Sequence, residues 1–344
     1  PWAACVRWMT MTEQVPSSIP LAIIGAGPAG LAAVAVARRY GIDVALLDEQ
    51  SGPGGQIYRG IGYADADRMA MLGAEYADGR ALLPSAEDPG RHDLYGATVW
   101  QITADGEIYY SRGGKAAALR AEHIILATGA IERPMPIPGW TLPGVMTAGA
   151  GQTMLKSSGL VPQGRLVITG SGPLLWLLAV QYGRAGVDIA ALVETTPRGN
   201  YHQAVFKLPG LLREGTLLRQ GRALRRELKR QGVPHFKQAK DLRAMGDDQV
   251  EALRFAANGQ EHEIACDLLL LHMGVTPNVQ FTRALDLAHD WDQVQRCWRP
   301  RCGTAGETEI SNIRLAGDGA GIVGAGAAAL QGRLAALAVA REVG

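Results

Sequence analysis

Short apolar runs alternate along this chain with alanine-rich stretches of helical spacing, and turns that contain glycine separate them. From residue 21 the chain reads LAIIGAGPAGLAAVAVARRYGIDVALLDEQ, which predicts a strand, a glycine turn, a helix and a second strand that ends in acidic residues. The same order recurs over residues 165–194, in RLVITGSGPLLWLLAVQYGRAGVDIAALVE. This duplication predicts an α/β fold with two Rossmann-like dinucleotide-binding domains.

The chain leaves the first domain near residues 134–138, where three prolines follow a buried strand and cannot continue a strand or a helix. A strand, a glycine turn and a helix return from residue 312, in NIRLAGDGAGIVGAGAAALQGRLAALAVAREVG. We therefore expect the second domain to be inserted into the first. The expected boundaries are a disordered leader over residues 1–18, a first domain over 19–138 and 277–344, and a second domain over 139–276.

Charge and cysteine content argue against several classes of protein. The chain has 34 basic and 33 acidic residues, a net charge of +1, which does not favour nucleic acid as a partner. No apolar run approaches the roughly 20 residues that span a bilayer, so we do not expect an integral membrane protein. No C-x-x-C pair occurs among Cys5, Cys266, Cys297 and Cys302, which argues against a disulfide framework or a metal site and suits a reducing cytoplasm.

The motif GAGPAG, residues 25–30, has the context of a dinucleotide-binding turn. Gly25 permits the sharp turn after the strand, Gly27 lets the backbone approach a pyrophosphate, and Gly30 lets helix and strand pack closely. Two acidic residues, Asp48 and Glu49, end the next strand at the distance where a carboxylate binds ribose hydroxyls. We favour Asp48, because it is the first residue after the apolar run.

Two later segments add to this site. Gly54 and Gly55 precede Gln56 and Ile57 in a stretch that would run beside a bound pyrophosphate. The segment LAGDGAG places Gly317 and Asp318 between a strand and a helix. Asp318 would accept a hydrogen bond from a ribityl hydroxyl, and the helix N-terminus would stabilise negative charge on a reduced flavin. The alternative for Asp318 is a helix N-cap.

In this order, GAGPAG, the acid at residue 48, ATG at 127–129 and GD at 317–318 resemble the two-dinucleotide-binding-domain flavoproteins, which include the thioredoxin and ferredoxin reductases. The resemblance covers residues 20–344 and implies FAD in the first domain, with Thr128 and Gly129 at the crossover between domains. The cofactor-binding residues that we expect are Gly25, Gly27, Pro28, Ala29, Gly30, Asp48, Glu49, Gly55, Gln56, Ile57, Val99, Thr128, Gly129, Gly317, Asp318 and Ala327.

Within that class, three strings resemble the FAD-containing alpha subunits of heteromeric amino-acid-oxidising dehydrogenases: LLDEQSGPGGQIYRG, ATGAIERPMPIPGWTLPGVMTAGAGQTMLKSSGLVP and AGDGAGIVGAGAAALQGRLAALA. That group includes opine oxidases, hydroxyproline and proline dehydrogenases, and the flavoprotein subunit of hydrogen cyanide synthase. The resemblance implies oxidation of an amino acid or opine-like amine in a beta flavoprotein subunit, with electrons relayed through this chain. A small iron–sulfur subunit is a further implied partner. Family members commonly continue into a cysteine-rich cluster domain, whereas this chain ends at Gly344.

The second glycine turn, residues 170–175, departs from the fingerprint. Gly170 and Gly172 can form the turn and Pro173 fits the first helical position, but Leu175 stands where a third glycine is expected. We expect Leu175 to push the helix from the strand and widen the site. Glu194 could bind ribose hydroxyls, while Arg198 lacks the second arginine that a 2′-phosphate would need. The turn therefore binds NAD(H), another adenine nucleotide in a displaced pose, or no ligand.

Two other functions stay open: a stand-alone NAD(P)H-dependent flavin or ferredoxin-type reductase, and a non-catalytic subunit that holds a nucleotide. A disulfide reductase is disfavoured, because Cys297 and Cys302 are separated by Pro300 and no closer pair occurs. We interpret His272, at the end of a strand, as a structural histidine. No catalytic residue can be assigned, since no acid–base set of recognisable spacing occurs.

Overall fold

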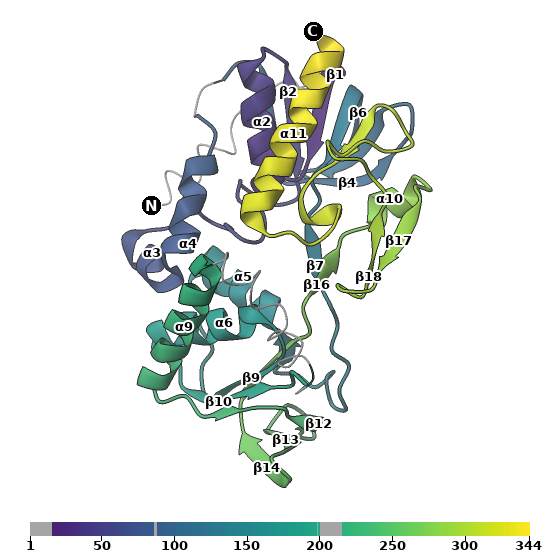
Figure 1. The fold of residues 1–344 in the computed structure, drawn as a ribbon. Coiled ribbons are helices and arrows are strands. Elements are labelled where there is room, and N and C mark those ends of the chain that lie inside the picture. Colours follow the sequence, from purple (N-terminus) through teal and green to yellow (C-terminus); the bar gives the residue numbers. More distant parts are fainter. Residues whose placement is uncertain (1–15, 86–87, 198, 200–214) are drawn as a thin grey trace. The chain divides into compact units, whose positions relative to one another are not determined.

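The computed structural model describes residues 16–85, 88–197, 199 and 215–344, which form two compact units (Figure 1). Unit 1 contains the described residues up to Gly62 together with Asp78–Ile131 and Thr276–Gly344, and unit 2 contains Tyr63–Ala77 and Glu132–Val275. The predicted α/β class with an inserted second domain is confirmed. Most of the predicted leader lies outside the described residues, and so do Arg198 and Cys5.

The division into units differs in one place from the expected boundaries, which stay predictions. Residues 63–77 precede the proline-rich segment in sequence but belong to unit 2. They contain α3 (Ala66–Leu72) and α4 (Ala74–Ala77). The buried side chain of Gln181 donates a hydrogen bond from Nε2 to the Leu72 carbonyl at 3.0 Å, which ties α3 to unit 2.

Unit 1 is built on a seven-stranded sheet. Strands β1, β2, β3, β6 and β19 run parallel, and β4 and β5 extend the sheet with antiparallel pairings. The order is β3-β2-β1-β6-β5-β4, with β19 also paired to β6. The bounds are β1 Ser18–Ile24, β2 Val44–Asp48, β3 Arg91–Tyr95, β4 Ala97–Ile102, β5 Glu107–Arg112, β6 Lys115–Leu126 and β19 Ile313–Leu315.

The central strands β1 and β2 are buried on both faces, which explains why they are continuous apolar runs. Side chains alternate along β1, so that Leu21 and Ile23 pack in one core cluster and Ala22 and Ile24 in another. The first cluster includes residues of α2 (Pro28–Arg39) and α11 (Ala325–Val343), which lie side by side in Figure 1. The sequence-distant ends of unit 1 therefore share one core.

Close packing of α2 on α11 gives a first testable prediction. A methyl group on Gly332 of α11 would lie 2.0 Å from the Ala29 carbonyl oxygen, so Gly332→Ala forces the helices apart. We expect the free energy of unfolding to fall by about 1–3 kcal/mol. Gly326→Ala, in the same helix with no atom within 4 Å, is the matched control and should be neutral or stabilising by about 0.5–1 kcal/mol. Urea titrations that give equal midpoints for both variants would contradict this packing.

Unit 2 contains a parallel sheet of order β11-β10-β9-β15-β8 and an antiparallel sheet of order β12-β13-β14. Its described helices include α5 (Ala148–Ser158), α6 (Pro173–Arg184) and α9 (Gly215–Arg230). The strands are β8 Val145–Thr147, β9 Leu166–Gly170, β10 Ile189–Glu194, β11 His235–Phe236, β12 Lys240–Met245, β13 Ala252–Ala257, β14 Gln260–Ala265 and β15 Leu268–His272. One core cluster joins the two sheets through residues such as Val167, Leu269 and Phe255.

Short elements complete the described chain. The strands β7 and β16 pair where the chain crosses between the units, and β17 and β18 form a hairpin in unit 1. The bounds are β7 Ala130–Glu132, β16 Val275–Pro277, α10 Gln280–Ala284, β17 His289–Asp292, β18 Cys297–Pro300, η1 Asp78–Leu82 and η2 Gly317–Gly319. Across the described residues, every helix is too short or too polar to serve as a membrane span.

Candidate functional site

The first glycine turn, residues 25–30, connects β1 to α2 with backbone contacts that only glycine permits. Gly25 has φ +108°, and a Cβ there would lie 2.3 Å from the Ala127 carbonyl oxygen of the neighbouring strand end. A Cβ on Gly30 would lie 1.8 Å from the Gly25 carbonyl oxygen. The turn is therefore fixed by close packing between strand and helix.

This turn leaves the N-terminus of α2 open for an anion. The N-cap residue is Gly27, which has no side chain to accept the first N–H groups, and Pro28 follows at the start of the helix. The first helical turn contains no acidic residue. Unsatisfied N–H groups and the positive end of the helix dipole are the features that bind a pyrophosphate.

The second predicted segment lies against this turn. Gly54 donates its N–H to the Ala26 carbonyl at 2.8 Å, and a Cβ on Gly55 would come within 2.7 Å of the Gly27 Cα. The structure thus brings residues 54–55 to the place where a pyrophosphate would bind. The side chain of Ile57 is exposed, so it offers apolar surface close to the turn.

Asp48 has a structural task in addition to any contact with ribose. Its Oδ2 accepts a hydrogen bond from the Ala26 N–H at 2.6 Å, and its Oδ1 accepts one from the Gln50 N–H at 2.8 Å. Burial raises the pKa of the Asp48 carboxyl, and the two N–H donors act against this shift. Glu49 follows at the same strand end and is exposed, and its contact with ribose stays a prediction.

Gly317 and Asp318 reach the same turn from the other end of the chain. A Cβ on Gly317 would lie 2.9 Å from the Ala29 Cβ, which places η2 directly beside α2. Asp318 Oδ1 accepts hydrogen bonds from the N–H groups of Val323 at 2.8 Å and Gly324 at 3.0 Å. Asp318 therefore stabilises the loop before α11, a role similar to the helix N-cap considered as the alternative. Its Oδ2 has no hydrogen-bond partner among the described residues and is available to a ligand hydroxyl.

The crossover residues also lie at this site. Thr128 donates from Oγ1 to the Asn278 carbonyl at 3.2 Å. A Cβ on Gly319 would lie 3.0 Å from the same Oγ1, so Gly319 packs closely against this hydroxyl. Gly129 has φ +67°. Ala327 is exposed in the first turn of α11. Val99 packs against the second core cluster of unit 1 and has no described contact with the glycine turn, so its role in cofactor binding stays a prediction.

A hairpin of β17 and β18 is attached to the loop that follows Asp318. Gln295 donates from Nε2 to the Ile322 carbonyl at 2.8 Å and accepts from the Ile322 N–H through Oε1 at 3.2 Å. The hairpin displays two half-exposed indoles, Trp291 and Trp298, whose ring centroids are 5.5 Å apart. The arrangement fixes an aromatic surface to the predicted flavin end of the site.

Cys297 begins β18 of this hairpin and Cys302 follows its end, and neither forms a described disulfide. Cys297 is buried, and burial raises the pKa of the Cys302 thiol. A raised pKa keeps the thiol protonated and a poor nucleophile, which does not favour a redox-active pair. Among the described residues, no group of three or more His, Cys, Asp or Glu side chains could hold a metal ion.

The second glycine turn shares the close packing of the first at its first glycine but differs at the N-cap, where Gly172 has φ +109° and Gly27 has φ −78°. Gly170 has φ +131°, and a Cβ there would lie 1.8 Å from the His272 carbonyl oxygen. The N-cap Gly172 and Pro173 start α6 without a side-chain cap or an acidic residue in the first turn. Leu175 takes the place of Gly30 and is completely buried.

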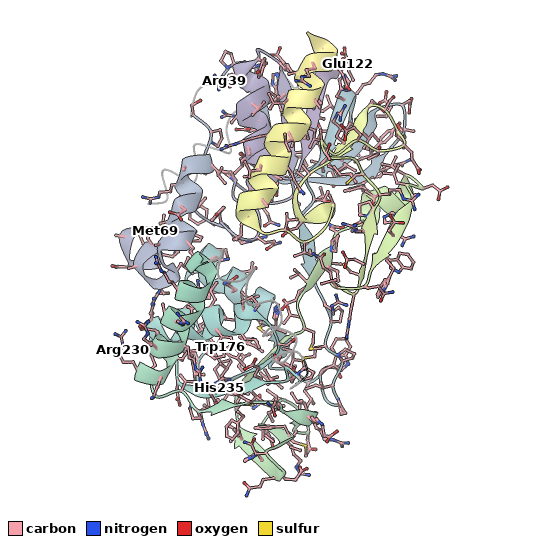
Figure 2. All side chains as sticks on the ribbon, viewed as in Figure 1. Arg39, Met69, Glu122, Trp176, Arg230 and His235 are labelled. Carbon is pink, nitrogen blue, oxygen red and sulfur yellow. The ribbon has the colours of Figure 1, made fainter. Side chains whose placement is uncertain are left out.

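Glu194 is at the expected strand end but is engaged with another side chain. It is only 6% exposed, and its Oε2 lies 3.2 Å from His235 Nε2. The His235 ring also packs edge-on against Trp176 of α6, with centroids 4.8 Å apart; both residues are labelled in Figure 2. Ribose binding by Glu194 would therefore compete with an existing contact.

His272 has a partner that the sequence did not indicate. Its Nδ1 lies 2.5 Å from Oε1 of Glu132, and Oε2 of Glu132 accepts the Gly149 N–H at 2.7 Å at the start of α5. The two residues are 140 positions apart, and no motif or spacing connects them. Glu132 ends β7, which pairs with β16, and His272 ends β15 in the parallel sheet, so the pair forms between two separate sheets.

Comparison with known proteins decides the family. The model of the pyridine nucleotide-disulphide oxidoreductases matches residues 19–344. The chain belongs to this family. It is 38% identical over 342 residues to an opine oxidase subunit from Agrobacterium tumefaciens, covering 97% of this chain and 67% of that protein. It is 34% identical over 331 residues to the hydrogen cyanide synthase subunit HcnB of Pseudomonas aeruginosa, covering 92% and 70%.

A solved structure shows the same fold. L-proline dehydrogenase from P. horikoshii has a TM-score of 0.67 at 20% identity, over 95% of this chain and 56% of that one. The chain spans about two thirds of the length of the curated relatives that it matches. The predicted resemblance is confirmed, and the chain is an FAD-dependent oxidoreductase of the type that forms one subunit of a larger enzyme.

Proposed function

We propose that this chain holds FAD in unit 1 and relays electrons for a heteromeric dehydrogenase that oxidises an amino acid or an opine-like amine. The observation that carries the proposal is the contrast between the two glycine turns. The first is open and surrounded by every predicted motif, while the second has its strand-end acid engaged by His235. Relatives named as subunits of opine oxidase and hydrogen cyanide synthase support the substrate class.

The residues of unit 1 fit the parts of FAD. The open N-terminus of α2 would bind the pyrophosphate, Asp48 and Glu49 the ribose, and Asp318 Oδ2 a ribityl hydroxyl. The N-terminus of α11 would stabilise negative charge at the flavin end. When bound, FAD supplies the capacity to take up electrons and pass them on, and the chain contributes binding, orientation and electrostatics.

On this proposal the substrate is oxidised in a partner, a beta flavoprotein subunit, and a small iron–sulfur subunit is a further partner. Free and buried thiols suit a reducing cytoplasm. The second function that the site supports is a stand-alone NAD(P)H-dependent reductase, which requires unit 2 to bind NAD(P)H productively. A non-catalytic nucleotide-holding subunit is the third.

An anaerobic titration of the flavin-loaded protein with NADH and NADPH tests these functions. We expect the flavin absorbance to persist, because Glu194, the carboxylate that would hold the adenine ribose of the nucleotide, is paired with His235. Dithionite should bleach the flavin and serves as the positive control for a reducible cofactor. Rapid stoichiometric bleaching by either nucleotide would overturn the relay function and establish a nicotinamide-dependent reductase. An absence of flavin after loading would favour the nucleotide-holding subunit.

A further inference from the structure

The hairpin of β17 and β18 gathers apolar side chains at the surface of unit 1. Trp291 and Trp298 are 43% and 49% exposed, and Val294 in the connecting turn is 85% exposed. Trp291 lies opposite Trp298 in the strand register, so the two indoles share one face of the hairpin. We refer to these three residues as the indole patch. A group of exposed apolar side chains on a globular protein marks an interaction site.

Other residues of the hairpin hold the indole patch in place. Asp292 Oδ1 accepts hydrogen bonds from the N–H groups of Val294 and Gln295, each at 2.8 Å, and so fixes the turn. The side chain of Cys297, which lies opposite Asp292 in the register, is buried. A surface that is ordered before binding loses little conformational freedom when a partner binds.

An arginine adds charge to the indole patch. The guanidinium carbon of Arg283 in α10 lies over the Trp298 ring, 5.3 Å from its centroid, and α10 lies beside the hairpin in Figure 1. Arg283 is exposed, and the described residues include no ion-pair partner for it. Tryptophan and arginine are the residues most enriched at the energetic centres of protein interfaces. The complementary surface is an apolar pocket bordered by carboxylates.

The position of the hairpin indicates which kind of protein binds there. Gln295 makes two hydrogen bonds to Ile322, in the loop that Asp318 stabilises at the predicted flavin end of the site. Val323, which follows Ile322, is itself 43% exposed. Because electron transfer slows steeply with the distance between redox groups, a protein that exchanges electrons with the flavin must approach this end of unit 1. The indole patch lies where such a protein would bind.

A second copy of this chain fits the surface less well. In a twofold contact the same patch is presented by both copies, so the two Arg283 side chains would approach each other. Like charges placed together across an interface are unfavourable. A different polypeptide that carries carboxylates meets no such repulsion.

We propose that the indole patch and Arg283 form the docking surface for the amine-oxidising flavoprotein partner of the dehydrogenase. This inference rests on the proposed function and adds the place on the chain where that partner binds. The partner contributes an apolar pocket for the two indoles and a carboxylate for Arg283.

Isolation of the flavin-loaded chain through an affinity tag, from the cells that naturally produce it, tests the proposal. Native mass spectrometry and flavin analysis of the isolated complex should show a second, flavin-containing polypeptide. In the double variant Trp291→Ala with Trp298→Ala, we expect the amount of this partner per chain to fall about tenfold or more, while the chain keeps its own flavin. Arg283→Glu should lower the amount of partner in the same way, because it places a carboxylate against carboxylates.

Matched variants control for general effects of substitution. Trp100→Ala removes an indole that is also 49% exposed but lies on β4, and it should keep the partner at the parent ratio. Arg283→Lys preserves the positive charge and should retain most of the partner. If the double variant loses its own flavin through unfolding, the comparison of Arg283→Glu with Arg283→Lys decides.

The docking inference alone is wrong if the parent carries the flavoprotein partner and both the double variant and Arg283→Glu retain it at the parent ratio. It is also wrong if the parent forms a pair of identical chains that the double variant separates, since a second copy then occupies the patch. A parent that carries flavin but no second flavoprotein would overturn the relay function together with this inference.

Discussion

Gly30→Ala should yield a protein that purifies with little bound flavin and unfolds at a lower denaturant concentration than the parent. The added methyl group would lie 1.8 Å from the Gly25 carbonyl oxygen, which is backbone and cannot rotate away. Helix α2 must then shift from β1, and the N–H groups at its start lose their position at the pyrophosphate. We expect a loss of about 1–3 kcal/mol in stability from overpacking alone. Flavin absorbance per polypeptide and a urea titration measure the two effects.

Gly62→Ala is the matched control in unit 1, because a Cβ at Gly62 meets no atom within 4 Å. It should retain flavin at the parent ratio and change stability by well under 1 kcal/mol. The role assigned to the first glycine turn is wrong if Gly30→Ala keeps a full complement of flavin. A variant that loses stability but keeps flavin would separate packing from cofactor binding.

Asp318→Ala should weaken FAD binding about ten- to hundredfold, since it removes a charged acceptor for a ribityl hydroxyl and also frees the loop before α11. The loop loses the acceptor of the Val323 and Gly324 N–H groups, which is comparable to the loss of a helix cap, about 0.5–2 kcal/mol. Titration of the apoprotein with FAD, followed by flavin fluorescence, measures the affinity.

Asp318→Asn separates the two roles of this side chain. The amide oxygen can still accept from the loop, so stability should stay near that of the parent, while the loss of charge weakens the contact with the hydroxyl. If Asp318→Asn and Asp318→Ala bind FAD as tightly as the parent, Asp318 serves only as a loop cap. Equal losses of stability in both variants would instead show that the charge stabilises the loop.

Local sequence patterns were sufficient to predict the fold and the first glycine turn. The turn depends on close contacts of β1 with α2 and with the end of β6. Glycines at fixed spacing permit these contacts, and the closest are at Gly25 and Gly30. The late Gly317 and Asp318 were predicted from a strand, turn and helix of their own. Their position beside Ala29 confirms that both ends of the chain build unit 1.

The pairs that distinguish the second turn were not predictable in this way. Glu132 with His272 and Glu194 with His235 join residues 140 and 41 positions apart. Glu194 and His235 lie on the neighbouring parallel strands β10 and β11, whereas Glu132 lies in β7, outside the sheet that contains His272. The order of parallel strands is set by crossover connections, and no local pattern reports which strand ends become neighbours. For the same reason, the assignment of α3 to unit 2 follows from the buried Gln181 contact and not from chain order.

The two hydrogen bonds between Gln295 and Ile322 couple the loop after Asp318 to a hairpin whose tryptophan fluorescence can be measured. Trp291 and Trp298 share a hairpin with Gln295, so a displacement of the loop after Asp318 is transmitted to the surroundings of both indoles. Indole emission responds to the polarity and packing around the ring. Tryptophan fluorescence of the unlabelled protein should therefore follow events at the flavin end of unit 1, with Gln295→Ala as the variant that uncouples the signal.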